Sequence, residues 1–120
     1  MKLLFIDDDP GFNDLATQAS TNYGVDFKVV DNFQDADKLL KSYEPTHVFV
    51  DIFVPKGNGI DFVKEHQSYP GKFYLMTVDF EKEGAADRLN NSAVFFNGTI
   101  TKDKFINGLR ALVMSDTGRN

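Results

Sequence analysis

Apolar residues are concentrated in five short runs, and between the runs they recur at every third or fourth position. Each run has four or five residues and is bounded by polar or turn-forming residues, a pattern typical of strands buried on both faces of a sheet. The runs are KLLFI at 2–6, DFKVV at 26–30, HVFV at 47–50, KFYLM at 72–76 and AVFF at 93–96. We therefore expect five strands.

The stretches between and after the runs have the periodicity of amphipathic helices, each with one apolar face. The apolar positions are Phe12, Leu15, Ala16, Ala19 and Tyr23, then Ala36, Leu39, Leu40 and Tyr43, then Ile60 and Val63, then Phe80, Ala85 and Leu89 in a weaker helix over 80–91, and finally Phe105, Ile106, Leu109 and Val113. We expect Gly24, Pro45 and Pro70 to end the first, second and third helices. Asn32 and Thr101 are expected to cap the starts of the second and fifth helices. Helices thus follow each of the five strands.

Strands that alternate with helices indicate an α/β protein whose parallel sheet is covered on both faces. Right-handed crossovers leave few arrangements for five such strands. We expect the doubly wound, flavodoxin-like sheet with strand order 2-1-3-4-5. A chain of 120 residues suits one hydrophobic core, so residues 1–120 are expected to form a single domain.

Composition narrows the functional classes. The chain has 13 basic and 18 acidic residues without a basic stripe, so we expect no direct contact with nucleic acid. It has no cysteine, which excludes disulfides, thiolate metal sites and a cysteine nucleophile. No apolar segment approaches the roughly 20 residues that a membrane-spanning helix needs. A cytoplasmic protein that does not contact membranes is the expectation.

Acidic residues cluster where two of the expected strands end. Asp7, Asp8 and Asp9 follow the first strand, and Asp51 follows the third. These strands are neighbours in the expected sheet, and functional groups of doubly wound sheets gather at the carboxyl ends of the strands. Adjacent carboxylates repel unless a cation compensates them. We expect two of these first-loop aspartates and Asp51 to form a pocket for Mg²⁺, which prefers oxygen ligands, while Asp9 is a solvated neighbour or a charge in the first turn of a helix.

The same edge carries groups suited to phosphoryl transfer. A carboxylate at a strand end can act as a nucleophile toward phosphorus when a metal ion neutralises the charge of the phosphoryl oxygens. Thr77 follows the fourth strand, and its hydroxyl can donate a hydrogen bond to one of those oxygens.

The segments FIDDDPGF, VFVDIFVPKGNGIDF and LMTV, at their spacing, resemble the receiver domain of bacterial two-component response regulators. The resemblance covers essentially the whole chain. It implies that Asp51 accepts a phosphoryl group from a histidine kinase or a histidine phosphotransfer protein. It further implies that Asp7, Asp8 and the backbone carbonyl of Phe53 bind Mg²⁺, and that Thr77 turns toward the phosphoryl group.

By the same resemblance the chain is a stoichiometric phosphoacceptor rather than an enzyme, although it can catalyse its own phosphorylation and the hydrolysis of its aspartyl phosphate. Family members often form homodimers through the fourth helix, the fifth strand and the fifth helix. The family usually has Lys-Pro at the end of the fifth strand, where Asn97 and Gly98 are expected here. Val94 takes the place of an aromatic switch residue, and Lys102 is expected to point to solvent.

Two other functions stay open. A phosphorylation-independent interaction module, or pseudo-receiver, is favoured by the replacement of the lysine by Asn97. A phosphatase or phosphotransferase of the haloacid-dehalogenase kind is suggested by the Asp-x-Asp pattern of residues 7–9. The latter family needs a late lysine near the pocket and usually a cap insertion, and neither is evident.

Overall fold

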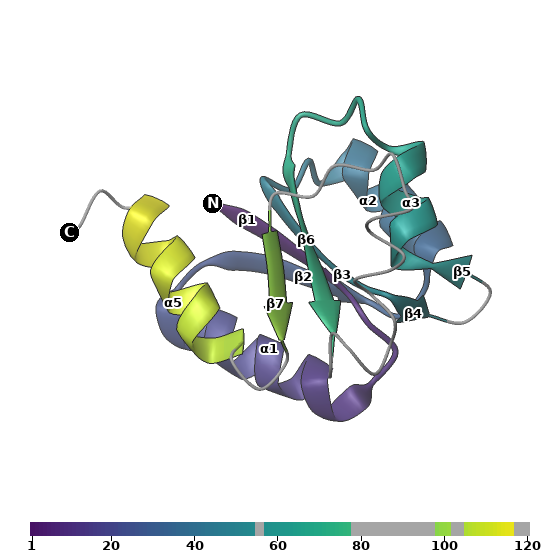
Figure 1. Cartoon of the computed structure of the whole chain (residues 1–120). Helices are drawn as coiled ribbons and strands as arrows, with labels where there is room; N and C mark the ends of the chain where they lie inside the picture. The colour runs from purple at the N-terminus through teal and green to yellow at the C-terminus, as the bar shows by residue number, and fades with distance from the viewer. Residues whose placement is uncertain (55–56, 78–97, 102–104, 117–120) are drawn as a thin grey trace.

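A computed structural model describes residues 1–54, 57–77, 98–101 and 105–116 of the chain. Five parallel strands form one sheet in the order β2-β1-β3-β6-β7 (Figure 1). The strands are β1 Lys2–Ile6, β2 Asp26–Val30, β3 His47–Asp51, β6 Lys72–Thr77 and β7 Gly98–Thr101. Counted along the chain without the separate hairpin between β3 and β6, this is the order 2-1-3-4-5, so the flavodoxin-like fold is confirmed.

Both faces of the sheet are covered by helices. These are α1 Pro10–Tyr23, α2 Phe33–Ser42, α3 Gly59–Glu65 and α5 Phe105–Asp116. Leu3 and Phe5 of β1 pack in a core with α1 and α5, whereas Leu4 and Ile6 pack in a second core with α2 and α3. The alternation follows from the pleat of a strand, which sends successive side chains to opposite faces.

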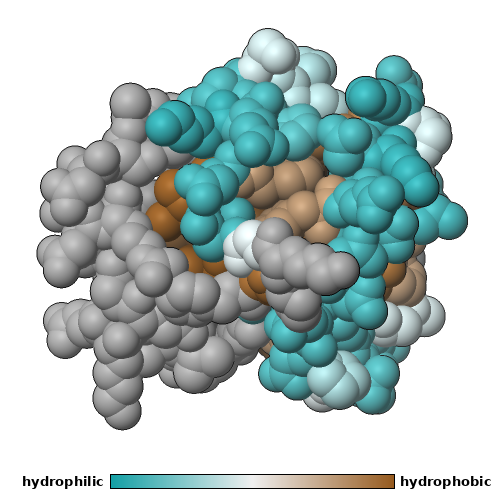
Figure 2. All heavy atoms as spheres, turned by 90° about the vertical axis from the view of Figure 1, so that its right-hand side faces the viewer, coloured by the Kyte–Doolittle hydropathy of each residue, from teal (hydrophilic) through white to brown (hydrophobic). Residues whose placement is uncertain are grey.

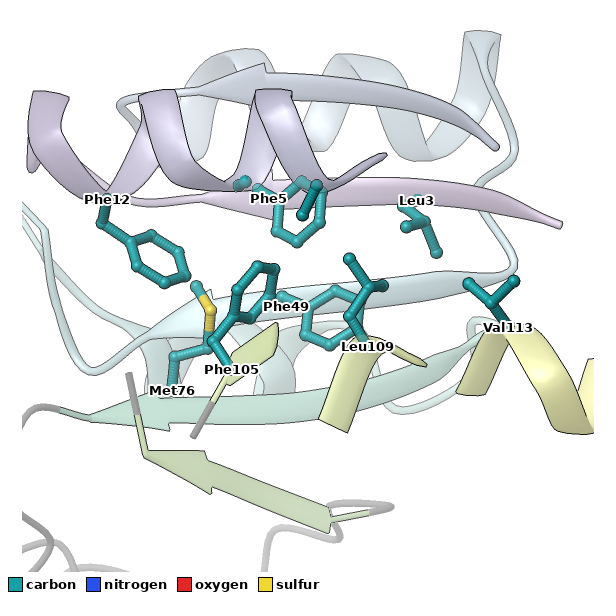
Figure 3. Packing of buried hydrophobic residues seen from close by; sticks show 10 residues of the cluster. Leu3, Phe5, Phe12, Phe49, Met76, Phe105, Leu109 and Val113 are labelled. Atoms are coloured by element: carbon teal, nitrogen blue, oxygen red, sulfur yellow. The ribbon is translucent and has the colours of Figure 1, made fainter. Parts of the chain in front are cut away.

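The core beneath α1 and α5 combines aliphatic side chains with a group of packed aromatic rings (Figure 3). Phe5 stacks on Phe49 with ring centroids 5.0 Å apart, joining the two strands whose ends carry the aspartates. Phe105, at the start of α5, meets Phe5 edge to face at 5.6 Å and Phe12 of α1 at 4.9 Å. Each such pair is worth about 0.5–1.5 kcal/mol beyond the area it buries. Phe105 therefore joins both helices of this face to the sheet.

The last strand of the sheet, β7, was not predicted as a strand. Residues 93–96 lie outside the described part of the chain, and the strand that pairs with β6 is Gly98–Thr101, from Tyr74↔Gly98 to Thr77↔Thr101. The threonines and isoleucine of GTIT are β-branched and suit a sheet position even though the segment is not an apolar run. Gly98, which was expected at the end of the fifth strand, instead begins β7, and Asn97 lies outside the described residues. Lys102 is the residue that follows it in sequence.

Smaller corrections concern the helices. Thr101 belongs to β7 and does not cap the last helix, and α3 ends at Glu65 rather than near Pro70. Leu15 and Ile106 are each 38% exposed, so they lie beside the buried helix faces and not within them. The expected helix over 80–91 and Val94 lie outside the described residues.

A two-stranded hairpin leads from β3 into α3. Its strands, β4 Phe53–Val54 and β5 Gly57–Asn58, are antiparallel. The side chain of Asn58 accepts a hydrogen bond from the Asp61 amide and caps α3. On this side of the molecule, hydrophobic residues lie recessed between hydrophilic ones (Figure 2).

Two contacts tie α3 to α2. Phe33 stacks on Phe62 at 5.0 Å, and His66 Nε2 lies 2.8 Å from Asp37 Oδ1. The hydrogen bond with His66 lowers the pKa of Asp37 below its ordinary value, although burial of the carboxyl acts in the opposite direction. These contacts hold the helix that follows the hairpin in a fixed position on the sheet.

Within the described residues, no helix combines the length and the apolar character that crossing a membrane requires.

Gly59, the first residue of α3, lies directly against the backbone of Asp51. Its amide donates a hydrogen bond to the Ile52 carbonyl at 2.7 Å. A Cβ atom at this position would collide with the Asp51 carbonyl oxygen and would lie 2.6 Å from Val50 Cγ1. Only glycine permits this approach, so Gly59 fixes the backbone on which the Asp51 side chain stands.

We predict that Gly59→Ala lowers the free energy of unfolding by about 2 kcal/mol, in the range that forced overpacking costs. Urea denaturation followed by circular dichroism measures the change. Gly57→Ala is the matched control, because its Cβ would meet only the ring edge of Phe33, at 3.1 Å, which can shift. Equal stability losses in the two variants would contradict the close approach at Gly59.

Candidate functional site

The carboxyl ends of β1 and β3 bring the expected aspartates together. In the register of the sheet Ile6 lies beside Val50, so the next residues, Asp7 and Asp51, reach the same edge. Asp7, Asp8 and Asp51 each offer one carboxylate oxygen, and these oxygens lie within 4.8 Å of one another. Asp7 and Asp51 are buried, with 0% and 6% of their surface exposed, and Asp8 is exposed.

This cluster is electrostatically unfavourable on its own. Two unit charges about 5 Å apart repel by about 3 kcal/mol at an effective dielectric constant of about 20. Burial of Asp7 and Asp51 adds a desolvation cost to the repulsion. A divalent cation among the oxygens would offset both. The donor set consists of carboxylates, which are the hard ligands that Mg²⁺ prefers, so Asp7, Asp8 and Asp51 could hold this ion.

The loop that carries the first two aspartates is tightly bonded. The Asp7 amide donates to the Val30 carbonyl of β2 at 3.1 Å, and Asp7 Oδ1 accepts from the Asp9 amide at 2.9 Å. The backbone and one oxygen of Asp7 are therefore positioned before any ion binds.

Asp9 precedes the first turn of α1 instead of lying within it. Its side chain caps α1 by accepting a hydrogen bond from the Gly11 amide at 3.0 Å, and Pro10 opens the helix. Asp9 is exposed and does not belong to the carboxylate cluster.

The backbone places the two remaining candidates near this edge. Asp51 pairs with Met76 of β6, so Thr77 is one residue beyond the position that faces Asp51. Phe53, whose carbonyl is a further expected metal ligand, opens β4 two residues after Asp51. The roles of Thr77 and the Phe53 carbonyl stay predictions.

Two residues that shape the site were missed from the sequence. Gly59 packs on the Asp51 backbone, and Asn13 donates from Nδ2 to the Asp7 carbonyl at 2.8 Å. The glycine after the PKGN segment gave a weak signal for a close approach. An asparagine in a helix gives none, because its partner depends on the path of the preceding loop.

Part of the chain is similar in sequence to a known regulatory protein. No protein-family model matches the sequence. The transcriptional regulatory protein CitB of Klebsiella pneumoniae is 32% identical over 63 residues, which are 51% of this chain. The chain matches only 27% of the length of CitB, about a quarter.

Solved structures match over nearly the whole chain. A two-component response regulator from Clostridium difficile has a TM-score of 0.81 at 20% identity, covering 99% of this chain and 97% of its own. A CheY-like receiver domain from Methylobacillus flagellatus has a TM-score of 0.76 at 19% identity, with coverage of 96% and 97%. The receiver domain of a sensor histidine kinase from Pseudomonas aeruginosa, with a magnesium ion coordinated in its active-site cleft, has a TM-score of 0.80 at 13% identity, with coverage of 95% and 94%. At these identities the match shows the fold, which is that of receiver domains.

The repulsion within the cluster can be measured without a metal ion. In a chelator, we predict that Asp8→Asn raises the free energy of unfolding by about 1 kcal/mol, because one exposed like charge is removed from the group. Asp14→Asn, an exposed aspartate of α1 outside the cluster, is the control and should not stabilise the protein. Urea denaturation at low ionic strength gives both values. A destabilised Asp8→Asn variant would mean that protein groups already compensate this carboxylate.

Proposed function

We propose that the chain is a phosphoacceptor domain of a two-component system. Asp51 accepts a phosphoryl group from a histidine kinase or a histidine phosphotransfer protein, and Asp7, Asp8 and Asp51 bind Mg²⁺. The observation that supports this most strongly is the convergence of these three carboxylates at the carboxyl edge of a receiver-type sheet.

The reaction needs little beyond a positioned carboxylate. An oxygen of Asp51 attacks the phosphorus of a phosphohistidine, the new O–P bond forms, and the P–N bond breaks with its electron pair left on the imidazole nitrogen. When bound, Mg²⁺ neutralises charge on the phosphoryl oxygens. The burial of Asp51 restricts the access of water to the acyl phosphate that results. The tight backbone approach of Gly59 keeps the nucleophile in place.

Three further groups complete the proposed site. The Phe53 carbonyl is a further protein ligand of the metal, and the Thr77 hydroxyl donates to a phosphoryl oxygen. Lys102 supplies the lysine that the receiver family has after its fifth strand, since it directly follows β7 in sequence. The alternative, in which Asn97 takes the place of that lysine, is a pseudo-receiver.

The partners and the wider context belong to the same proposal. The match to a transcriptional regulator and to receiver domains supports a stoichiometric signalling role for residues 1–120 in place of catalytic turnover. Homodimers would form through the fourth helix of the family fold, β7 and α5. Ile106 and Met114 of α5 are 38% and 42% exposed and are available for such a contact.

Intact-mass spectrometry tests the proposal directly. After incubation with Mg²⁺ and acetyl phosphate or phosphoramidate, we predict that the protein gains one phosphoryl group and that Asp51→Asn gains none. The control is Asp61→Asn, which removes an exposed carboxylate of α3 outside the cluster of Asp7, Asp8 and Asp51. This variant should be labelled like the wild type.

Two outcomes would contradict the proposal. A folded protein that is labelled by no donor would instead be an interaction module. Release of inorganic phosphate over many turnovers would indicate a phosphatase of the haloacid-dehalogenase kind.

A further inference from the structure

The first turn of α1 folds back onto the loop that carries the metal-site aspartates. The Asn13 amide donates to the Asp9 carbonyl at 3.0 Å, as a helix requires, and the Asn13 side chain donates from Nδ2 to the Asp7 carbonyl at 2.8 Å. This side-chain bond reaches six residues back along the chain, out of the helix and into the loop. It ties the loop to a rigid element.

Asparagine at this position has a cost for stability. It forms helices less well than alanine. In addition, Asn13 Oδ1 is buried and has no hydrogen-bond partner among the residues that the structure describes. A buried amide oxygen in that state is unfavourable. Locally unfavourable residues occur where function requires them, so the side chain calls for an explanation beyond helix stability.

The bond acts on the peptide group between Asp7 and Asp8. The Asp7 carbonyl belongs to the peptide whose nitrogen is that of Asp8, so its direction sets the direction in which the Asp8 side chain leaves the backbone. Asp8 is exposed, and packing does not hold its carboxylate near those of Asp7 and Asp51. The orientation of this peptide, together with the Asp8 rotamer, therefore determines whether the Asp8 oxygen joins the cluster.

We propose that Asn13 is a positioning residue that holds the Asp7–Asp8 peptide in the orientation that binds a divalent cation. The inference rests on the proposed function, because it concerns the same metal site. Together with the bonds of Asp7 to Val30 and Asp9, the Asn13 bond fixes the loop at its amide, at one carboxylate oxygen and at its carbonyl. The entropy cost of ordering the loop is then met when the protein folds, so it does not weaken cation binding.

Mn²⁺ is a suitable probe, since it also takes oxygen ligands and the free ion is counted by electron paramagnetic resonance. We predict that Asn13→Ala and Asn13→Leu each bind Mn²⁺ about 10-fold more weakly than the wild type, the lower end of the effect of losing an outer-shell partner. The two variants differ in size and share only the loss of the donor. Gln18→Ala, an exposed position of the same helix, is the control and should keep the wild-type affinity.

The free energy of unfolding, measured in the presence of a chelator, distinguishes a positioning role of Asn13 from a purely structural one. If Asn13 positions the loop, Asn13→Ala should be at least as stable as the wild type without metal while it loses affinity. Wild-type affinity in both variants would overturn the inference and leave the metal site intact. A wild-type protein without affinity for Mn²⁺ at millimolar concentration would overturn the inference together with the proposed site.

Discussion

The mutual repulsion of the carboxylates of Asp7, Asp8 and Asp51 is the constraint that the rest of the structure has to meet. Asp7 and Asp51 are neighbours because β1 and β3 are adjacent parallel strands in register, and Asp8 joins them from the loop. The chain can fold with these charges close together only if other interactions offset the free energy of their repulsion and desolvation. Burial of each large apolar side chain contributes about 1.5–3 kcal/mol, and the two cores contain many such residues on both sides of β1 and β3.

The site is held by backbone more than by side chains. Gly59 lets α3 approach the Asp51 carbonyl, and the Asx-type bond from the Asp9 amide occupies one oxygen of Asp7. Asn13 and Val30 hold the same loop from the helix and from β2. A site in this arrangement is largely formed before a ligand arrives, which reduces the ordering cost of binding a cation or a phosphoryl group.

The sequence predicted the features of the fold that depend on local patterns of apolar residues. The apolar runs located β1, β2, β3 and β6, and strand order placed Asp7 and Asp51 at one edge. It did not predict β7, because the β-branched GTIT is not an apolar run, and the strand expected at 93–96 lies outside the described residues. Gly59 and Asn13 were missed because their roles depend on which backbone group the folded chain brings against them. Tertiary contacts of that kind leave no periodic signal in a sequence.

The account depends most on a divalent cation among the three carboxylates. Paramagnetic line broadening by Mn²⁺ in amide ¹H–¹⁵N spectra tests this directly, since the effect falls steeply with distance from the ion. We expect the amides of residues 7–9 and 51–53 to broaden first and to recover when excess Mg²⁺ is added. No broadening at millimolar Mn²⁺, or broadening that begins at the exposed Asp61 and Glu65 of α3, would contradict it.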